Sequence, residues 1–155
     1  MVEFDGPLLE LVTDSRTRFD RRLAALGPDV LAEEFDAERF LRRLRADDPT
    51  RPIGDALLDQ RTIAGVGNLW KAESCWEAGV SPWRIAAEVS DAEALAVVAA
   101  ARPRMLASAT HGHQDRDHRV YGRAGRPCPR CGARIRVRGQ GDDNRRTFWC
   151  ERCQR

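Results

Sequence analysis

The sequence predicts a mainly α-helical fold followed by a small β-hairpin that holds a metal ion through four cysteines. Between Thr13 and Thr110, apolar residues recur with the period of amphipathic helices. Near the C-terminus, two Cys-x-x-Cys pairs enclose a segment in which apolar residues alternate with arginine, the period of a half-buried strand. We therefore divide the chain into four parts: residues 1–12, a helical domain over 13–110, a linker over 111–119 and a zinc-binding module over 120–155.

The composition predicts a soluble cytoplasmic protein and excludes a membrane-spanning one. The longest apolar run, Ala92–Ala101, is too short to cross a bilayer and contains Glu93. No basic segment followed by an apolar run opens the chain, so we expect no secretory signal. In the reducing cytoplasm the five cysteines predict metal binding rather than disulfides, and Cys75 is left without an assigned role.

The charge of the chain is unevenly distributed. Residues 1–101 contain 12 Lys and Arg against 19 Asp and Glu, whereas residues 102–155 contain 14 against 5. All the cationic residues except Lys71 are arginines, whose planar guanidinium group suits phosphate. We therefore expect a polyanionic partner, with nucleic acid favoured over a membrane surface. A solvated basic surface without a partner is the alternative.

The first twelve residues predict one short strand, Leu8–Val12, which follows the turn-forming pair Gly6-Pro7. A lone strand buries little apolar surface by itself. We therefore expect this segment to be the remnant of an N-terminal domain that is absent from the chain.

A helix is predicted to begin after Asp36, whose side chain can cap it. Phe40, Leu41 and Leu44 form its apolar face. The arginines of this helix are expected to face mostly outward; they are Arg39, Arg42, Arg43 and Arg45. The pattern thus predicts an amphipathic helix on the surface of the core.

A second, alanine-rich helix begins after Ser90, which forms a capping box with Glu93. The helix is predicted to run toward Met105. Because proline lacks an amide hydrogen, Pro103 predicts a kink or the end of this helix.

Between these helices lies a Gly-x-Gly-Asn turn at Gly65, Gly67 and Asn68. Two glycines permit a tight turn with uncovered backbone amides, and Asn68 adds a side-chain donor where the next helix begins. That helix is predicted to end at Gly79 and to bury Leu69, Ala72 and Trp76. The amides and the helix N-terminus together predict an anion site, although Gly-x-Gly between helices is often only a turn.

The four paired cysteines predict one structural zinc site. Cys128, Cys131, Cys150 and Cys153 form two Cys-x-x-Cys pairs separated by 18 residues, a spacing typical of four-cysteine zinc sites. Four thiolates close the tetrahedron, so the metal is expected to be structural rather than catalytic. Redox chemistry is the competing interpretation, and a zinc ribbon that binds a protein partner is a further alternative.

Two strands are predicted between the cysteine pairs. Ala133, Ile135 and Val137 alternate with three arginines in the first strand, and "RRTFW" forms the second. The connecting segment "GQGDDN" is typical of a turn. The hairpin is therefore expected to present arginines on one face.

Three motifs together resemble the C-terminal half of the formamidopyrimidine-DNA glycosylase and endonuclease VIII family of base-excision-repair enzymes. In order along the chain they are "LLDQRTIAGVGNLWKAE", "HRVYGRAGRPCPRCG" and "RRTFWCERCQR". The resemblance covers the chain from about Leu26 and implies a helix-two-turns-helix domain followed by a zinc finger. It further implies that the chain binds damaged or abasic double-stranded DNA on the bacterial nucleoid, with one structural zinc ion.

The resemblance also implies roles for individual residues. Asn68 and Arg145 match the positions that grip phosphates of the damaged strand beside a flipped-out nucleotide. Gly65 and Gly67 belong to the same turn, and Lys71, one helical turn further on, is expected to contact a phosphate.

The N-terminus departs from the family pattern. Family members begin Met-Pro-Glu and use the proline amine as the nucleophile, whereas this chain begins Met-Val-Glu. We therefore expect a chain that lacks the N-terminal catalytic domain, carries no catalytic residue and is inactive alone. Two rival functions are an enzyme that uses another amine and a zinc-ribbon adaptor for nucleic acid or protein without a role in repair.

Overall fold

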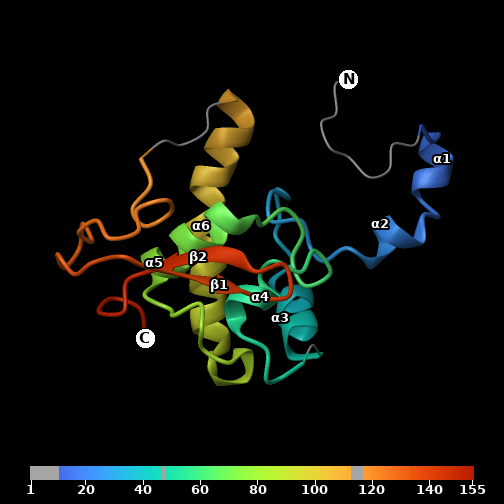
Figure 1. Cartoon of the computed structure of the whole chain (residues 1–155). Coiled ribbons are helices and arrows are strands. Elements are labelled where there is room, and N and C mark those ends of the chain that lie inside the picture. The colour runs from blue at the N-terminus through green and yellow to red at the C-terminus, as the bar shows by residue number, and fades with distance from the viewer. Residues whose placement is uncertain (1–10, 47, 113–116) are drawn as a thin grey trace.

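A computed structural model of the chain describes residues 11–46, 48–112 and 117–155 (Figure 1). The helical elements in chain order are α1 (Asp14–Thr17), α2 (Arg21–Ala25), α3 (Ala37–Ala46), α4 (Ile53–Ala56), α5 (Asn68–Ala78), the 3-10 helix η1 (Ala86–Glu88) and α6 (Asp91–His111). Two strands follow, β1 (Arg136–Gln140) and β2 (Arg145–Trp149). The predicted mainly helical fold with a C-terminal hairpin is confirmed. Most of the predicted strand Leu8–Val12 lies outside the described residues.

The helices pack around α5 and α6. Figure 1 shows these two helices side by side, with the hairpin lying across α5 and the short helices α1 and α2 extending away from them. The main core is built from apolar side chains of α3, α4, α5 and α6 and of the segments between them, and Phe40 and Leu44 supply the contribution of α3. Burial of these apolar surfaces stabilises the helices, since short helices are marginal on their own.

The hairpin packs directly on α5 through a second cluster. Its strands pair antiparallel, from Arg136 opposite Trp149 to Gln140 opposite Arg145. Ala72 and Trp76 of α5 pack there with apolar side chains of the C-terminal segment, including Val120, Ile135 and Phe148. One helix therefore belongs to both clusters, which fixes the hairpin relative to the helices. The predicted alternation fails at Val137, which is 41% exposed.

Both predicted N-terminal caps are present. Asp36 accepts a hydrogen bond from the backbone amide of Arg39 at 2.9 Å, and Ser90 and Glu93 form the reciprocal capping box of α6. Gly79 ends α5 in the left-handed conformation with φ 74°, as predicted. No helix of the described residues is both long enough and apolar enough to span a membrane.

Pro103 was predicted to kink or end the last helix, and the second alternative is wrong, because α6 continues to His111. Proline removes one backbone hydrogen bond, but tertiary contacts hold both sides of this position. Ala101 and Met105 are buried in the main core. Arg102 donates to the carbonyl oxygens of Val30 at 2.6 Å and Ala32 at 2.9 Å.

The prediction that the α3 arginines face mostly outward holds for Arg42 and Arg45, which are exposed, whereas Arg39 and Arg43 are only partly exposed. Arg39 donates to the carbonyl oxygen of Leu26, and Arg43 donates to those of Ala25 and Arg61. Arg45 donates to the carbonyl oxygens of Ala86 and Val89, in the segment that follows α5. These arginines tie loops to α3, so they are not available as a phosphate-binding surface.

Candidate nucleic-acid interface

The Gly-x-Gly-Asn turn forms the N-terminus of α5, as predicted. Gly65 has φ +95° and its amide donates to Gln60 Oε1 at 2.8 Å, while Gln60 Nε2 donates to the carbonyl oxygen of Val66. Gly67 is the N-cap, and a Cβ there would meet nothing within 4 Å. No neighbouring atom would block a side chain at this N-cap, and a helix leaves its first amides without intrahelical partners, so the position suits an anion.

Asn68 connects this turn to the hairpin. Its Nδ2 donates to the carbonyl oxygen of Arg146 in β2 at 3.0 Å. Its Oδ1 is buried and has no hydrogen-bond partner among the described residues. The contact places the N-terminus of α5 against the first residues of β2. Asn68 and Arg145 therefore both lie at the line of contact between α5 and β2, which we call the seam.

Arg145 is half-exposed at the start of β2 and is paired with the neighbouring turn. Its guanidinium group lies 3.0 Å from Asp143 Oδ2, with side-chain exposures of 51% and 71%. A phosphate would compete with this carboxylate for the same donors. Because the pair is solvent-exposed, its contribution to stability is small, and exchange of partners costs little.

An acidic cleft of about 670 Å³ adjoins Arg145. Its lining includes five aspartates: Asp48, Asp55, Asp59, Asp142 and Asp143. Burial raises the pKa of Asp55, whereas hydrogen bonds from Arg61 and Arg51 lower the pKa of Asp59. Arg51 and Arg61 also line the cleft and pair with Asp59, so the negative charge of the aspartates is partly compensated.

The predicted contact of Lys71 with a phosphate does not fit the structure, because this side chain is fully buried. Its ammonium group donates to Thr147 Oγ1 and to Gln140 Oε1, both in the hairpin. Burial, assisted by the nearby Arg145 and opposed by Cys75 and Asp55, lowers the pKa of Lys71 to about 8. The helical period placed Lys71 near the turn, but packing directs its side chain into the interior.

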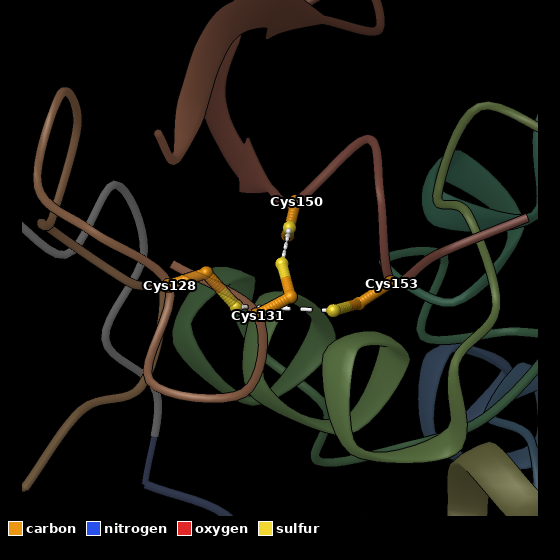
Figure 2. A group of neighbouring side chains, drawn as sticks. All are labelled: Cys128, Cys131, Cys150 and Cys153. Atoms are coloured by element: carbon orange, nitrogen blue, oxygen red, sulfur yellow. Dashed lines mark hydrogen bonds between the residues drawn. The ribbon is translucent and has the colours of Figure 1, made fainter. Parts of the chain in front are cut away.

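The four predicted cysteines lie together (Figure 2), with all their sulfur atoms within 4.8 Å of one another. Cys131 Sγ lies 3.5 Å from Cys150 Sγ, and Cys128 Sγ lies 3.9 Å from Cys153 Sγ. Four sulfurs at 2.3 Å from a central ion would be about 3.8 Å apart in a tetrahedron. The donor set and its geometry therefore fit a tetrahedral thiolate-bound metal ion.

The protein environment favours the thiolate at Cys128 and disfavours it at Cys153. Burial raises the pKa of the Cys128 thiol, but hydrogen bonds from Trp76 Nε1 and from the amides of Arg130 and Cys131 outweigh it and lower the value to about 6. Burial and the neighbouring thiols raise the pKa of Cys153 to about 12. Four thiolates at this spacing repel one another, and a divalent cation removes that repulsion.

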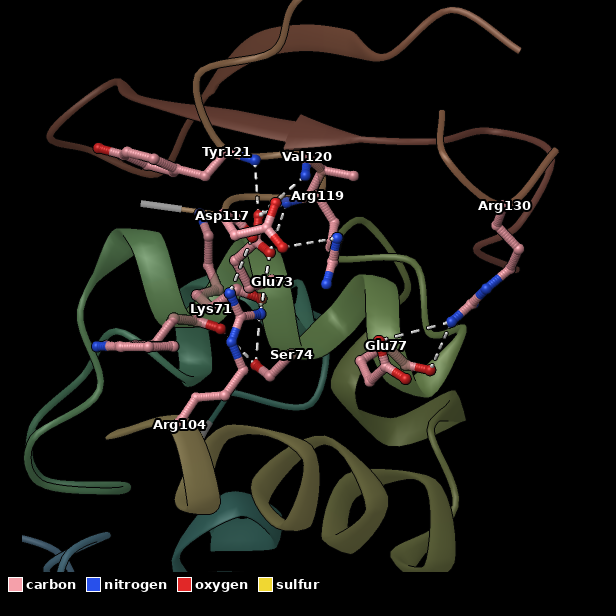
Figure 3. A network of polar contacts seen from close by, with 11 residues as sticks. Lys71, Glu73, Ser74, Glu77, Arg104, Asp117, Arg119, Val120, Tyr121 and Arg130 are labelled. Atoms are coloured by element: carbon pink, nitrogen blue, oxygen red, sulfur yellow. Dashed lines mark hydrogen bonds and ion pairs between the residues drawn. The ribbon is translucent and has the colours of Figure 1, made fainter. Parts of the chain in front are cut away.

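A buried carboxylate attaches the metal-binding segment to α5 (Figure 3). Glu73 is 1% exposed and accepts hydrogen bonds from three consecutive backbone amides, those of Arg119, Val120 and Tyr121. It also pairs with Arg104 of α6 at 3.2 Å. In the same view Lys71 points away from this network. Glu73 therefore joins α5, α6 and the start of the C-terminal segment.

A second contact between α5 and the metal-binding segment lies at the C-terminal end of the helix. The guanidinium group of Arg130 lies 4.2 Å from the ring centroid of Trp76 and donates to the Trp76 carbonyl oxygen at 3.0 Å. Trp76 in turn donates to the sulfur of Cys128 at 3.4 Å. A residue between the first two cysteines thus caps the C-terminus of α5, where a cation is favourable.

Sequence reasoning missed several residues of this interface: Glu73, Gln140, Thr147 and the roles of Trp76 and Arg130. The available signal was indirect. Glu73 and Lys71 are charged residues on a helix whose neighbours are mostly apolar, and charged side chains are seldom buried without a partner. That signal predicts a partner without saying which residue it is.

Residues 26–116 match the family described as "Formamidopyrimidine-DNA glycosylase H2TH domain". A Streptomyces coelicolor protein named "Probable endonuclease 8 2" is 42% identical over 156 residues, covering 96% of this chain and 55% of that protein. The chain thus spans about half the length of the curated relatives it matches.

Solved structures are also similar to this chain. A Thermus thermophilus MutM (Fpg) protein superposes with a TM-score of 0.75 at 33% identity, covering 89% of this chain and 57% of that one. A Lactococcus lactis Fpg in complex with DNA containing an abasic site superposes with a TM-score of 0.76 at 25% identity, covering 91% and 55%. The similarity therefore includes both the helices and the C-terminal segment of the chain.

Proposed function

The chain belongs to the formamidopyrimidine-DNA glycosylase family, and on that premise we propose that it is the DNA-binding part of a base-excision-repair glycosylase and lyase. It grips the backbone of damaged or abasic double-stranded DNA and works on the bacterial nucleoid in the cytoplasm. No residue of this chain is assigned a catalytic role.

The observation that carries the proposal is the hydrogen bond from Asn68 to the backbone of Arg146. This bond brings the N-terminus of α5 and the exposed guanidinium group of Arg145 to the same seam. We propose that one strand of DNA follows the seam, with a phosphate taking the place of Asp143 on Arg145. Backbone amides at Gly67 and Asn68 would receive a neighbouring phosphate.

One zinc ion is part of the proposal. Cys128, Cys131, Cys150 and Cys153 supply four thiolates and leave no open position, as structural zinc sites do. When bound, the ion cross-links the two ends of the hairpin segment and performs no chemistry on DNA. Its support of β2 keeps Arg145 in place opposite Asn68.

The experiment measures fluorescence anisotropy of a labelled duplex that contains a tetrahydrofuran abasic-site analogue, with the undamaged duplex as comparison. Zinc-loaded chain should bind the abasic duplex more tightly. Arg145→Ala should weaken binding by about 1 to 3 kcal/mol, the range for a lost charge-assisted hydrogen bond. Asn68→Ala should weaken it in the same direction.

Arg136→Ala is the matched control. Arg136 lies in the same hairpin, is similarly exposed at 59% and forms a similar ion pair, with Glu151 at 3.1 Å. Its removal changes the net charge by the same amount and should have a much smaller effect. Equal losses from the two arginine variants, together with equal affinity for the two duplexes, would refute the proposal and favour the zinc-ribbon adaptor.

A further inference from the structure

We propose that Lys71 is a positioning residue that holds Asn68 and Arg145 at the spacing needed to grip one DNA backbone. The proposal rests on the DNA-binding function proposed above and names the internal support of that site. Lys71 is the single lysine of the chain, and its side chain is directed into the protein rather than toward DNA.

The ammonium group of Lys71 lies in a closed polar triangle beneath the hairpin. Lys71 Nζ donates to Thr147 Oγ1 in β2 and to Gln140 Oε1 in β1 at 3.3 Å. Thr147 Oγ1 donates to the same Gln140 oxygen at 2.7 Å, and Gln140 Nε2 donates to the carbonyl oxygen of Pro82 at 2.8 Å. Lys71 and Thr147 are 0% exposed and Gln140 is 4% exposed, so water does not supply these hydrogen bonds.

This triangle lies next to Asn68 and Arg145, the two residues proposed to bind the DNA backbone. Lys71 follows Asn68 by one helical turn on α5. Thr147 follows Arg145 by two residues in β2, and Gln140 is the cross-strand partner of Arg145. The Lys71 hydrogen bonds and the Asn68 bond to Arg146 are therefore two ties across one seam, the first buried and the second at the surface.

Stability alone does not account for a charged group at this place. Burying an ammonium group is costly, and an apolar side chain of similar length often packs as well or better. The charged and titratable groups around Lys71 are Asp55 of α4, Arg145 of β2 and Cys75 on its own helix. An ammonium group donates in several directions, so it can fix both strands relative to α5, which an apolar side chain cannot do.

The test is a double-mutant cycle with abasic-analogue duplex. Lys71→Met keeps the length of the side chain and removes its donors, and it should weaken binding about tenfold, which corresponds to about 1.4 kcal/mol. If Lys71 acts through Arg145, then Arg145→Ala should cost far less in the Lys71→Met background than in the wild type. Ser74→Ala, at another buried position of α5 whose hydroxyl donates to the carbonyl oxygen of Trp70, should leave affinity unchanged.

Each outcome of this double-mutant cycle either supports or overturns the positioning role of Lys71. Wild-type affinity of Lys71→Met, or fully additive losses, would overturn the positioning role while Arg145→Ala still supports DNA binding by the chain. No loss from Arg145→Ala would overturn the proposed function itself. Should Lys71→Met fail to fold, as judged by circular dichroism and zinc content, Thr147→Val replaces it, because it removes the main acceptor of Lys71 at nearly constant shape. Unchanged affinity and unchanged coupling in Thr147→Val would then overturn the proposal.

Discussion

Replacement of Lys71 by methionine should change how the stability of the protein depends on pH. Burial lowers the pKa of Lys71 from an ordinary value of 10.5 to about 8 in the folded protein. Between these two values the unfolded chain binds more protons than the folded chain at this residue. Stability contributed by Lys71 therefore rises with pH in this window, because the cost of the buried ammonium group is full below pH 8 and disappears as the amine loses its proton.

The magnitude follows from the shift. A difference of one pKa unit corresponds to 1.36 kcal/mol, so complete titration of Lys71 amounts to about 3 kcal/mol, of which about 2.5 kcal/mol falls between pH 7 and pH 10. Other groups also titrate in this range, but they are common to the wild type and the variant. The quantity to predict is therefore the difference in free energy of unfolding between the two proteins, which should move by about 2.5 kcal/mol in favour of the wild type.

Urea denaturation of the zinc-loaded proteins at pH 7 and pH 10, followed by tryptophan fluorescence, measures this difference. Ser74→Ala is the control, because it removes a buried and non-titrating side chain from the same helix. Its difference from the wild type should be the same at both pH values. A Lys71→Met difference that also stays constant would refute the burial of a charged lysine, since a solvated lysine titrates alike in both states.

The metal, the buried carboxylate and the lysine amine each give a further measurable outcome. Native mass spectrometry should find one zinc ion per chain. Cys128→Ser should unfold residues 120–155 while the helices persist, because metal binding supplies on the order of 10 kcal/mol or more to the folding of such a module. Full DNA affinity of the metal-free protein would contradict this prediction. Glu73→Gln should lower the free energy of unfolding by about 2 kcal/mol or more, because buried amides and Arg104 lose a charged acceptor. Glu77→Gln, one turn further on α5 and 57% exposed, should change it by less than about 0.5 kcal/mol, and equal effects would exclude the special role of Glu73. Borohydride treatment on abasic-site DNA should trap no adduct at Lys71, because its buried amine cannot reach a sugar carbon; a strong adduct that Lys71→Ala abolishes would show an active enzyme instead.

Features encoded within short stretches of the chain were predictable. The cap at Asp36, the capping box at Ser90 and the left-handed end of α5 at Gly79 depend on residues within one helical turn of each other. The two Cys-x-x-Cys pairs likewise predicted the cysteine cluster, because each tight turn brings two thiols together. The hairpin followed from alternation and turn residues, although its buried positions were partly misassigned.

Tertiary packing decided where the charged side chains of α5 go. Local pattern predicted that Lys71 meets a phosphate, yet it binds Thr147, 76 residues further along the chain. Glu73 reaches amides 46 to 48 residues away, and no local signal identifies those partners.

What the sequence by itself determined is therefore the three longer helices, the hairpin, the cluster of four cysteines and the turn before α5, since each depends on neighbouring residues and backbone geometry. What only the tertiary structure decided is which face of α5 receives the hairpin, and hence that Lys71 is a support and Arg145 is exposed. The reason is physical: a hydrogen bond between distant residues forms only where burial of apolar surface has first brought their elements together, and no local pattern encodes that distance.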